Sequence, residues 1–134
     1  MLLENDVIFA YLNEYDPKHK TVARIFDMLR AGRLGLQISS VALLEMELIY
    51  RSEKVEDRLL RDLAALAALP NVEYVPLTAD IAVTATYLRQ NKQLSFFDSH
   101  YAATSLSLDG KILSYDLAYE RIEGIKRIRP ESMG

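Results

Sequence analysis

The stretch LGLQISSVALLEMELI, residues 34–49, carries the pattern that decides the fold. It begins with a short apolar run, Leu34–Ile38, which has the length and composition of a buried strand. Ser39 or Ser40 then offers a side-chain oxygen that can cap the start of a helix. Apolar residues recur at helical spacing after the serines, so the stretch predicts a strand that passes directly into a helix.

The same alternation of strand and helix runs along the whole chain. Further short strands are expected at Met1–Leu3, Val72–Val75, Lys111–Ser114 and Ile125–Ile128. The helices expected between them cover about Val7–Tyr15, Pro17 to a cap at Gly32, Val55–Leu69, Ala79–Asn91 and Phe96–Leu108. Strands that are separated by helices are joined by crossovers, so we expect an α/β fold: a three-layer α/β/α sandwich with a mostly parallel sheet of four to five strands.

The composition fits one globular domain and excludes several kinds of site. The chain has 134 residues, half of them hydrophobic, and no cysteine, which excludes disulfides, thiolate metal sites and cysteine nucleophiles. Its net charge of −3 means that a nucleic-acid site would have to be a local basic patch. The start of the chain lacks the pattern of a secretory signal, and no apolar run approaches the roughly 20 residues of a membrane span. We therefore expect a soluble, cytoplasmic protein.

Acidic residues stand at the places where a parallel α/β sheet binds its ligands, outside the carboxyl ends of the strands. Glu4 and Asp6 follow the first expected strand, and Asp116 follows the fourth. Asp98 lies in the first turn of a helix, and Glu45 lies on the helix face that is expected to be apolar. Each acid also has a structural explanation, such as a turn for Asp116 or a helix start for Asp98. The explanation is weakest for Glu45, because a lone carboxylate on an apolar face is costly.

The expected core face around Glu45 contains Val41, Leu44 and Leu48. Glu47 points away from it and can pair with Arg51 on the surface. A buried Glu45 would need a neutralising partner, and a bound cation is one candidate.

Acids that converge without basic partners repel one another, and a divalent cation relieves that repulsion. A site made only of carboxylate oxygens suits Mg²⁺ or Mn²⁺ rather than zinc. The candidate metal ligands are Glu4, Asp6, Glu45, Asp98 and Asp116. Such a centre can activate water for attack on a phosphodiester, so the expected reaction is metal-dependent phosphodiester hydrolysis.

Four stretches in a fixed order carry a family resemblance. They are LLENDVIFAYL, ISSVALLEMELIY, LSFFDSHYAAT and ILSYDLAYERIEGIKRI, and together they extend over about residues 1–130. This arrangement resembles the PIN domain, especially the VapC-type toxin ribonucleases of prokaryotic toxin–antitoxin pairs. The resemblance implies one PIN-like domain over residues 1–134, endoribonuclease activity with Mg²⁺ or Mn²⁺, homodimerisation and, for a toxin, a cognate antitoxin. It implies that the catalytic acids are Glu4, Glu45, Asp98 and Asp116.

The sequence departs from the family pattern at two places. Where the family has Asp-Thr-Asn-Val, this chain has Glu4 at the Asp position and Asp6 at the Asn position. The position two residues after Asp116, often acidic in the family, is Ala118. These departures favour an alternative in which a catalytically impaired PIN-like scaffold acts through protein or RNA binding. A phosphoacceptor receiver domain is less favoured, because no Asp follows the third strand, at residues 76–78.

Two surfaces are candidates for partners. The segment Leu59–Leu69 has an apolar arc wider than one core-facing stripe, which favours a homodimer interface, although a helix buried between its neighbours would look the same. RNA is expected to bind a local basic rim with candidate contacts at Arg51, Lys54, Lys126 and Arg127, and with Arg89 and Lys92 as further candidates. The basic run at Lys126 is also typical of a solvated edge strand.

Overall fold

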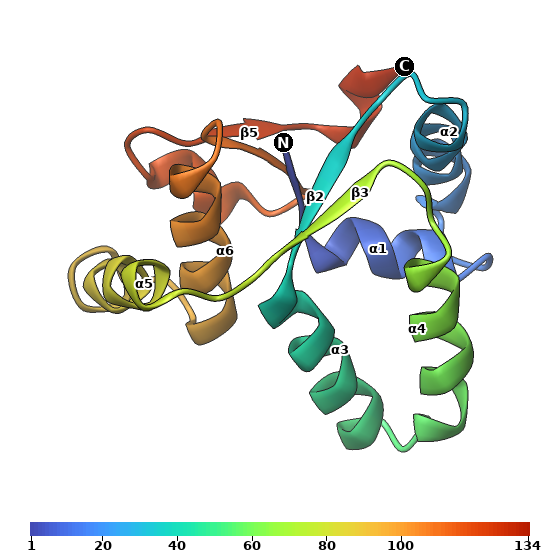
Figure 1. The fold of residues 1–134 in the computed structure, drawn as a ribbon, viewed down its shortest axis with the longest axis horizontal. Helices are drawn as coiled ribbons and strands as arrows, with labels where there is room; N and C mark the ends of the chain where they lie inside the picture. The colour runs from blue at the N-terminus through green and yellow to red at the C-terminus, as the bar shows by residue number, and fades with distance from the viewer.

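A computed structural model describes all residues from Met1 to Gly134 and shows a five-stranded parallel sheet (Figure 1). The sheet order is β3-β2-β1-β4-β5. The strands are β1 (Leu2–Leu3), β2 (Leu36–Ser39), β3 (Val72–Val75), β4 (Lys111–Leu113) and β5 (Lys126–Ile128). The predicted parallel α/β sandwich is confirmed, and so is the fifth strand.

Six helices cover the sheet. They are α1 (Asn5–Leu12), α2 (His19–Arg30), α3 (Ser40–Ser52), α4 (Leu59–Ala67), α5 (Ala79–Lys92) and α6 (Phe96–Ser107). In Figure 1, α5 and α6 lie on one side of the sheet, and α1, α2 and α4 lie on the other. Helix α3 leaves the carboxyl end of β2 and projects beyond the sheet edge. No helix in the structure combines the length and the hydrophobicity that a membrane span requires.

The core is built on the central strands. Leu2 and Leu3 of β1 pair with Ile112 and Leu113 of β4, and all four side chains are buried. Strand β1 is only two residues long and lies between β2 and β4. Both of its side chains pack into apolar layers, because both faces of a parallel sheet are covered at a central strand. The chain then leaves the sheet at Glu4, which is the first acid of the candidate site.

Helix boundaries differ from the sequence prediction where a side chain sets the start. Helix α1 begins two residues earlier than predicted, because the Glu4 carboxylate accepts a hydrogen bond from the Asp6 backbone N–H (3.3 Å) and caps the helix. Ser39 caps α3 by accepting from the Val41 N–H (3.1 Å). The single helix predicted over Val55–Leu69 is a 3-10 turn, Glu56–Arg58, followed by α4.

The predicted core face of α3 is confirmed at Val41 and wrong at Leu44 and Leu48. Leu44 and Leu48 are 53% and 47% exposed, and the residues that point inward are Val41, Ala42 and Met46. The reason is that α3 extends past the sheet (Figure 1), so only the side that faces its neighbouring helices is covered. Glu45 is half-buried and lies at the border of that side.

Candidate active site

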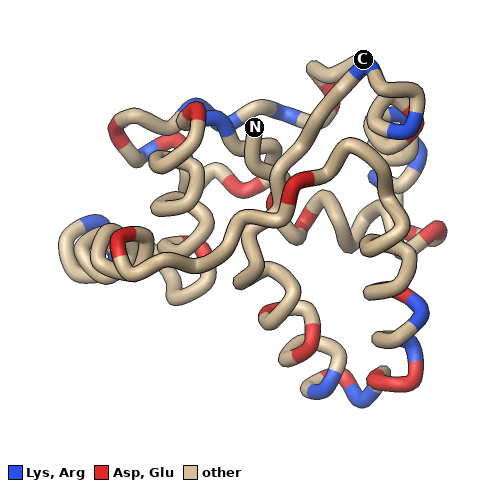
Figure 2. The backbone as a smooth tube through the Cα atoms, in the orientation of Figure 1, with Lys and Arg blue, Asp and Glu red and all other residues tan.

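The carboxyl edge of the sheet brings together acids from four separate stretches of sequence. Glu4 ends β1, Asp116 follows β4, Asp98 lies in the first turn of α6, and Glu45 lies in α3. Figure 2 shows Lys and Arg around the periphery of the fold, away from the region where α1 and α3 begin. None of these acids, and not Asp6 either, forms an ion pair with a basic group.

Ser114 links the acids that follow β1 to the end of β4. Its hydroxyl lies 3.1 Å from Glu4 Oε2 and 2.9 Å from Asp6 Oδ2, and it accepts a hydrogen bond from the Asp116 N–H (3.0 Å). Asp6 Oδ2 also accepts from the Tyr115 N–H (2.8 Å), whereas Asp6 Oδ1 is buried without a partner. The Asp6 side chain therefore points toward the residues that directly follow β4.

Glu45 is held by two buried polar side chains. Its Oε1 atom accepts hydrogen bonds from Asn5 Nδ2 and from the Tyr101 hydroxyl, both at 2.7 Å. Asn5 Nδ2 also donates to the Ala42 carbonyl oxygen (2.9 Å), so it connects α1 to α3. The Glu45 carboxylate therefore has the partners that a carboxylate on a partly buried face requires. These partners are neutral hydrogen-bond donors and not basic side chains.

Asp98 and Asp116 are held in a similar way by the 3-10 turn Leu117–Arg121. The Tyr119 hydroxyl donates to Asp98 Oδ1 (3.2 Å), and the Ala118 N–H donates to Asp116 Oδ1 (2.9 Å). Burial raises the pKa of both the Tyr119 and the Tyr101 hydroxyl well above its ordinary value, and the nearby carboxylates raise it further. Both tyrosines therefore keep their protons and act as hydrogen-bond donors.

Burial and mutual repulsion raise the pKa values of three acids. Burial raises the pKa of Glu4 to about 9, and the negative charges of Asp6 and Asp98 add to the effect. The pKa of Asp98 is raised by burial and then by the charges of Asp116 and Glu45. Burial likewise raises the pKa of Asp6. These acids lie within electrostatic reach of one another, and the fold supplies no positive charge to compensate them.

The donor chemistry of this site fits a hard divalent cation, but the present side-chain arrangement does not form a finished site. Nowhere in the structure are three or more acidic or histidine side chains arranged so that they could hold a metal ion. Each acid is instead bonded to its own neighbours, as with Glu4 on Ser114 and Glu45 on Tyr101. An all-oxygen set that lacks basic partners is the set that Mg²⁺ and Mn²⁺ prefer.

Sequence reasoning missed the neutral residues that hold the acids. Asn5, Tyr101 and Ser114 are buried and polar, and a buried polar group requires a hydrogen-bond partner. The available signal was their position, since Asn5 follows Glu4 directly and Tyr101 lies three residues after Asp98. The buried His100 makes a structural contact within α6, because its Nδ1 atom lies 2.8 Å from the Phe96 carbonyl oxygen.

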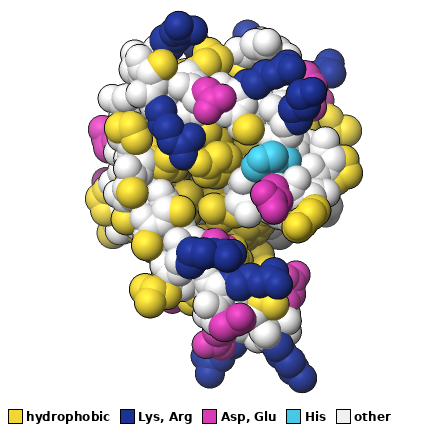
Figure 3. Space-filling model, turned by 90° about the vertical axis from the view of Figure 1, so that its right-hand side faces the viewer, with side chains coloured by type: hydrophobic (Ala, Val, Ile, Leu, Met, Phe, Trp, Pro, Cys, Tyr) yellow, Lys and Arg dark blue, Asp and Glu magenta, His cyan; other side chains and the backbone are white.

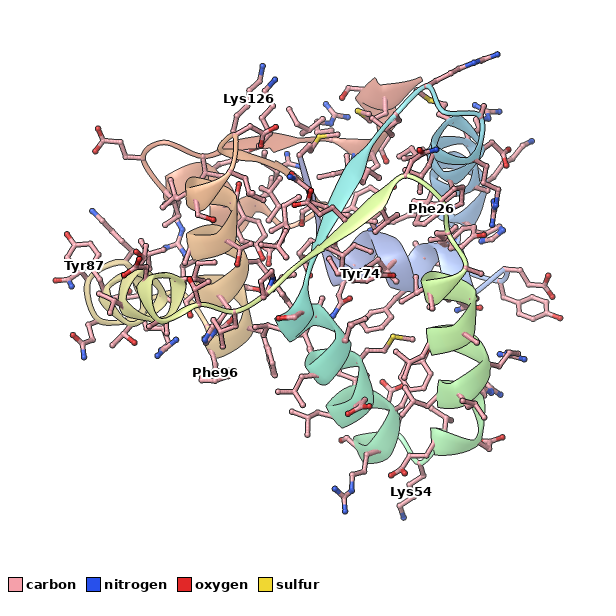
Figure 4. All side chains as sticks on the ribbon, in the orientation of Figure 1. Phe26, Lys54, Tyr74, Tyr87, Phe96 and Lys126 are labelled. Carbon is pink, nitrogen blue, oxygen red and sulfur yellow. The ribbon has the colours of Figure 1, made fainter.

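The basic candidates form no ion pair with the acids of the site, and they are not equivalent. Arg127 is 8% exposed at its side chain, because its guanidinium pairs with Glu120 (2.8 Å) and donates to the Ser114 carbonyl oxygen (3.0 Å). Arg51 is exposed and lies 3.7 Å from Glu56. Figure 4 shows Lys54 and Lys126 at opposite ends of the molecule.

A groove of about 940 Å³ lies between α1, α3 and α4 and does not include the acids of the site. It contains the aromatic side chains Phe9, Tyr11, Tyr15 and Tyr50 and the charged side chains Glu14, Asp16, Glu53, Arg58, Arg61 and Asp62. Figure 3 shows the hollowed face of the molecule with hydrophobic side chains at the floor. The groove can therefore accept an apolar segment of a partner.

Comparison with known families decides the classification. The family described as "PIN domain" matches residues 1–125. The chain belongs to the PIN domain family. No curated protein matches the sequence significantly.

Solved structures share this PIN-domain fold at low sequence identity. VapBC2 from Rickettsia felis, bound to a DNA fragment from its promoter, has a TM-score of 0.76 at 14% identity, and the match covers 96% of each chain. DNA-bound VapBC from Salmonella typhimurium gives 0.72 at 22% identity, with the same coverage. VapC20 from Mycobacterium tuberculosis, described as a toxin that cleaves the sarcin-ricin loop, gives 0.70 at 18% identity over 89% of this chain and 92% of that one.

The raised pKa of Glu4 makes stability depend on pH. The pKa rises from an ordinary value of 4.5 to about 9, so the folded state binds a proton more tightly than the unfolded state does. The stabilisation is complete below about pH 4.5 and is lost as the pH rises toward 9. With a chelator present, the unfolding free energy of wild type should decrease between pH 5 and pH 8. We expect this decrease to be smaller by roughly 2–4 kcal/mol in Glu4→Gln, because the glutamine side chain has no carboxyl proton to lose.

Urea denaturation across this pH range measures the effect. Glu47→Gln is the control, because Glu47 is an exposed acid on α3 and should leave the wild-type curve unchanged. Parallel curves for wild type and Glu4→Gln would contradict the burial of an ionisable group at this position.

Proposed function

We propose that this PIN-domain chain is a metal-dependent endoribonuclease and the toxin of a toxin–antitoxin pair, acting in the cytoplasm. The observation that carries the proposal is the convergence of Glu4, Glu45, Asp98 and Asp116 at one sheet edge, with no basic side chain paired to any of them. Such a cluster is costly to fold and is relieved by a divalent cation. The toxin nature of the solved neighbours supports the same activity.

In this proposal the four converging acids hold Mg²⁺ or Mn²⁺ and are the catalytic residues. A bound cation of this kind lowers the pKa of a water molecule and stabilises charge on a phosphodiester. Glu45 offers its Oε2 atom, which accepts no hydrogen bond, and Asp98 is held at Oδ1 by the Tyr119 hydroxyl. Asp6 remains a candidate fifth ligand, because Ser114 and the Tyr115 N–H donate to its Oδ2 atom whereas its Oδ1 atom has no partner.

The RNA substrate would reach this edge along basic side chains that are free to contact phosphates. Arg51, Lys54 and Lys126 are exposed and remain candidates. Arg127 is removed from the proposal, because its guanidinium already donates hydrogen bonds to the Glu120 carboxylate and to the Ser114 carbonyl oxygen. Phosphate contacts of this kind make binding depend on salt.

A cognate antitoxin is the proposed protein partner, as in the VapBC complexes that share the fold. The aromatic groove between α1, α3 and α4 is the surface that suits it best. A partner segment with apolar side chains would cover the groove floor, and its polar groups could meet Arg58 and Arg61 at the α4 side.

We propose that the chain also forms a homodimer, through α3 and α5. Large exposed apolar side chains occur there at Leu44, Leu48, Val83 and Tyr87, whereas Leu60 is the only large apolar side chain of α4 that is exposed. The α4 arc expected from the sequence is partly used inside the fold, since Leu66 is buried. Exposed apolar clusters on a small domain favour an interface.

The dimer is tested by the mass in solution at micromolar concentration. We expect wild type to have the mass of a dimer and Leu48→Glu to have that of a monomer, because a charge at the interface core is costly to bury. Leu60→Glu should remain dimeric. A monomeric wild type would contradict the proposal, and loss of the dimer in Leu60→Glu alone would move the interface to α4.

The activity is tested by Asp98→Asn. This change removes one charge with almost no change in volume, and the amide oxygen can still accept the Tyr119 hydrogen bond. With Mn²⁺ present, we expect cleavage of a structured RNA to fall by roughly a thousandfold, which is the order seen when a group that stabilises transition-state charge is lost. The melting temperature without metal should stay the same or rise, because repulsion at the site decreases.

Asp80→Asn is the matched control, since Asp80 is an exposed acid in the first turn of α5 and should leave the rate unchanged. Cleavage by Asp98→Asn at the wild-type rate would refute the assignment of Asp98. If wild type itself cleaves no RNA with either metal, the catalytically impaired scaffold is the better description.

A further inference from the structure

Two buried tyrosines from different elements direct their hydroxyls to acids of the site. Tyr101 of α6 and Tyr119 of the turn after β4 are the largest fully buried side chains in the protein. Their rings pack in the core, where a phenylalanine ring would fill nearly the same space. Packing of the apolar core therefore explains the two rings but not the two hydroxyls. One donates to Glu45 Oε1 (2.7 Å) and the other donates to Asp98 Oδ1 (3.2 Å).

Asn5 completes this arrangement. It is 2% exposed, and its Nδ2 atom lies 2.7 Å from the same Glu45 oxygen and 3.3 Å from the Tyr101 hydroxyl. Two donors from α1 and α6 thus converge on Glu45 Oε1, whereas Glu45 Oε2 accepts no hydrogen bond. At Asp98 the Tyr119 hydroxyl donates to Oδ1 (3.2 Å), and the Ser95 hydroxyl at the start of α6 is a second neutral hydrogen-bonding neighbour of the carboxylate.

We propose that Tyr101, Tyr119 and Asn5 are positioning residues that fix one oxygen of Glu45 and of Asp98, and so hold each carboxylate in the orientation in which it binds the metal. The inference rests on the proposed function, because it assigns a role toward the cation of that site. Neutral donors suit this role better than lysine or arginine would. They stabilise the ionised carboxylates while adding no positive charge that would compete with the cation.

A purely structural role for the hydroxyls predicts a different result. The Tyr101 hydroxyl also ties α6 to α1 and α3, through Asn5 and Glu45. If that were its only role, loss of the hydroxyl would reduce stability without changing the affinity for metal. The two roles are therefore separated by a binding measurement that needs no RNA.

The experiment measures Mn²⁺ binding to the full chain by titration calorimetry, for wild type, Tyr101→Phe and Tyr119→Phe. Partners that hold metal ligands typically change metal affinity by about 10–100-fold when they are removed, so we expect each variant to raise the dissociation constant about tenfold or more. The control is Tyr74→Phe, whose hydroxyl donates to the Leu66 carbonyl oxygen (3.0 Å) in another part of the fold. It should lose stability to a similar extent and bind Mn²⁺ as wild type does.

Two outcomes would overturn the inference, and they differ in what they say of the proposed function. Unchanged dissociation constants in both tyrosine variants, with wild type binding Mn²⁺, would refute the positioning role alone. A wild type that binds no Mn²⁺ would refute the metal centre and the positioning role together. Thermal denaturation shows whether each variant folds, and the use of two variants from separate elements keeps the test decisive if one of them does not.

Discussion

The pairing of β1 with β4 is the interaction on which the rest of the site depends. Leu3 lies opposite Leu113, and the Glu4 N–H donates to the Leu113 carbonyl oxygen (3.1 Å). This register brings Glu4 beside Ser114, although the two residues are 110 positions apart in the chain. Parallel strands end at the same edge of the sheet, so an acid after β1 and an acid after β4 must lie close together.

The second constraint is electrostatic. A fold that gathers acids at one edge loses stability unless something compensates their charge, and this fold provides neutral donors instead of bases. Ser114, Asn5, Tyr101 and Tyr119 each donate to a carboxylate. Hydrogen bonds of this kind reduce the cost of burying the acids but leave the site negative. The same property that makes the site costly to fold makes it suitable for a divalent cation.

The sequence was informative about the fold because each element carries a local signal. Apolar runs marked all five strands, and the helices expected to begin at Ala79 and Phe96 do begin there, capped by Thr78 and Ser95. It was less informative about α3, where an exposed apolar face was mistaken for the core face. Periodicity reports that Leu44 and Leu48 share a side of the helix, but not whether that side is covered by the protein.

The candidate acids could be named from the sequence, but their partners could not. Position after a strand predicts where Glu4 and Asp116 lie, since it follows from sheet topology alone. The contact between Asn5 and Glu45 joins residues 40 positions apart, and that between Tyr101 and Glu45 spans 56 positions. Contacts of this kind depend on how helices pack, and no local pattern encodes them.

Diffraction from crystals soaked in Mn²⁺, with data collected near the manganese absorption edge, tests the central claim most directly. The account predicts an anomalous peak at the sheet edge, within coordination distance of oxygens from Glu4, Glu45, Asp98 and Asp116. The same soak of Asp98→Asn crystals should weaken or abolish the peak. A peak elsewhere on the molecule, or no peak in well-diffracting wild-type crystals at millimolar Mn²⁺, would contradict the account.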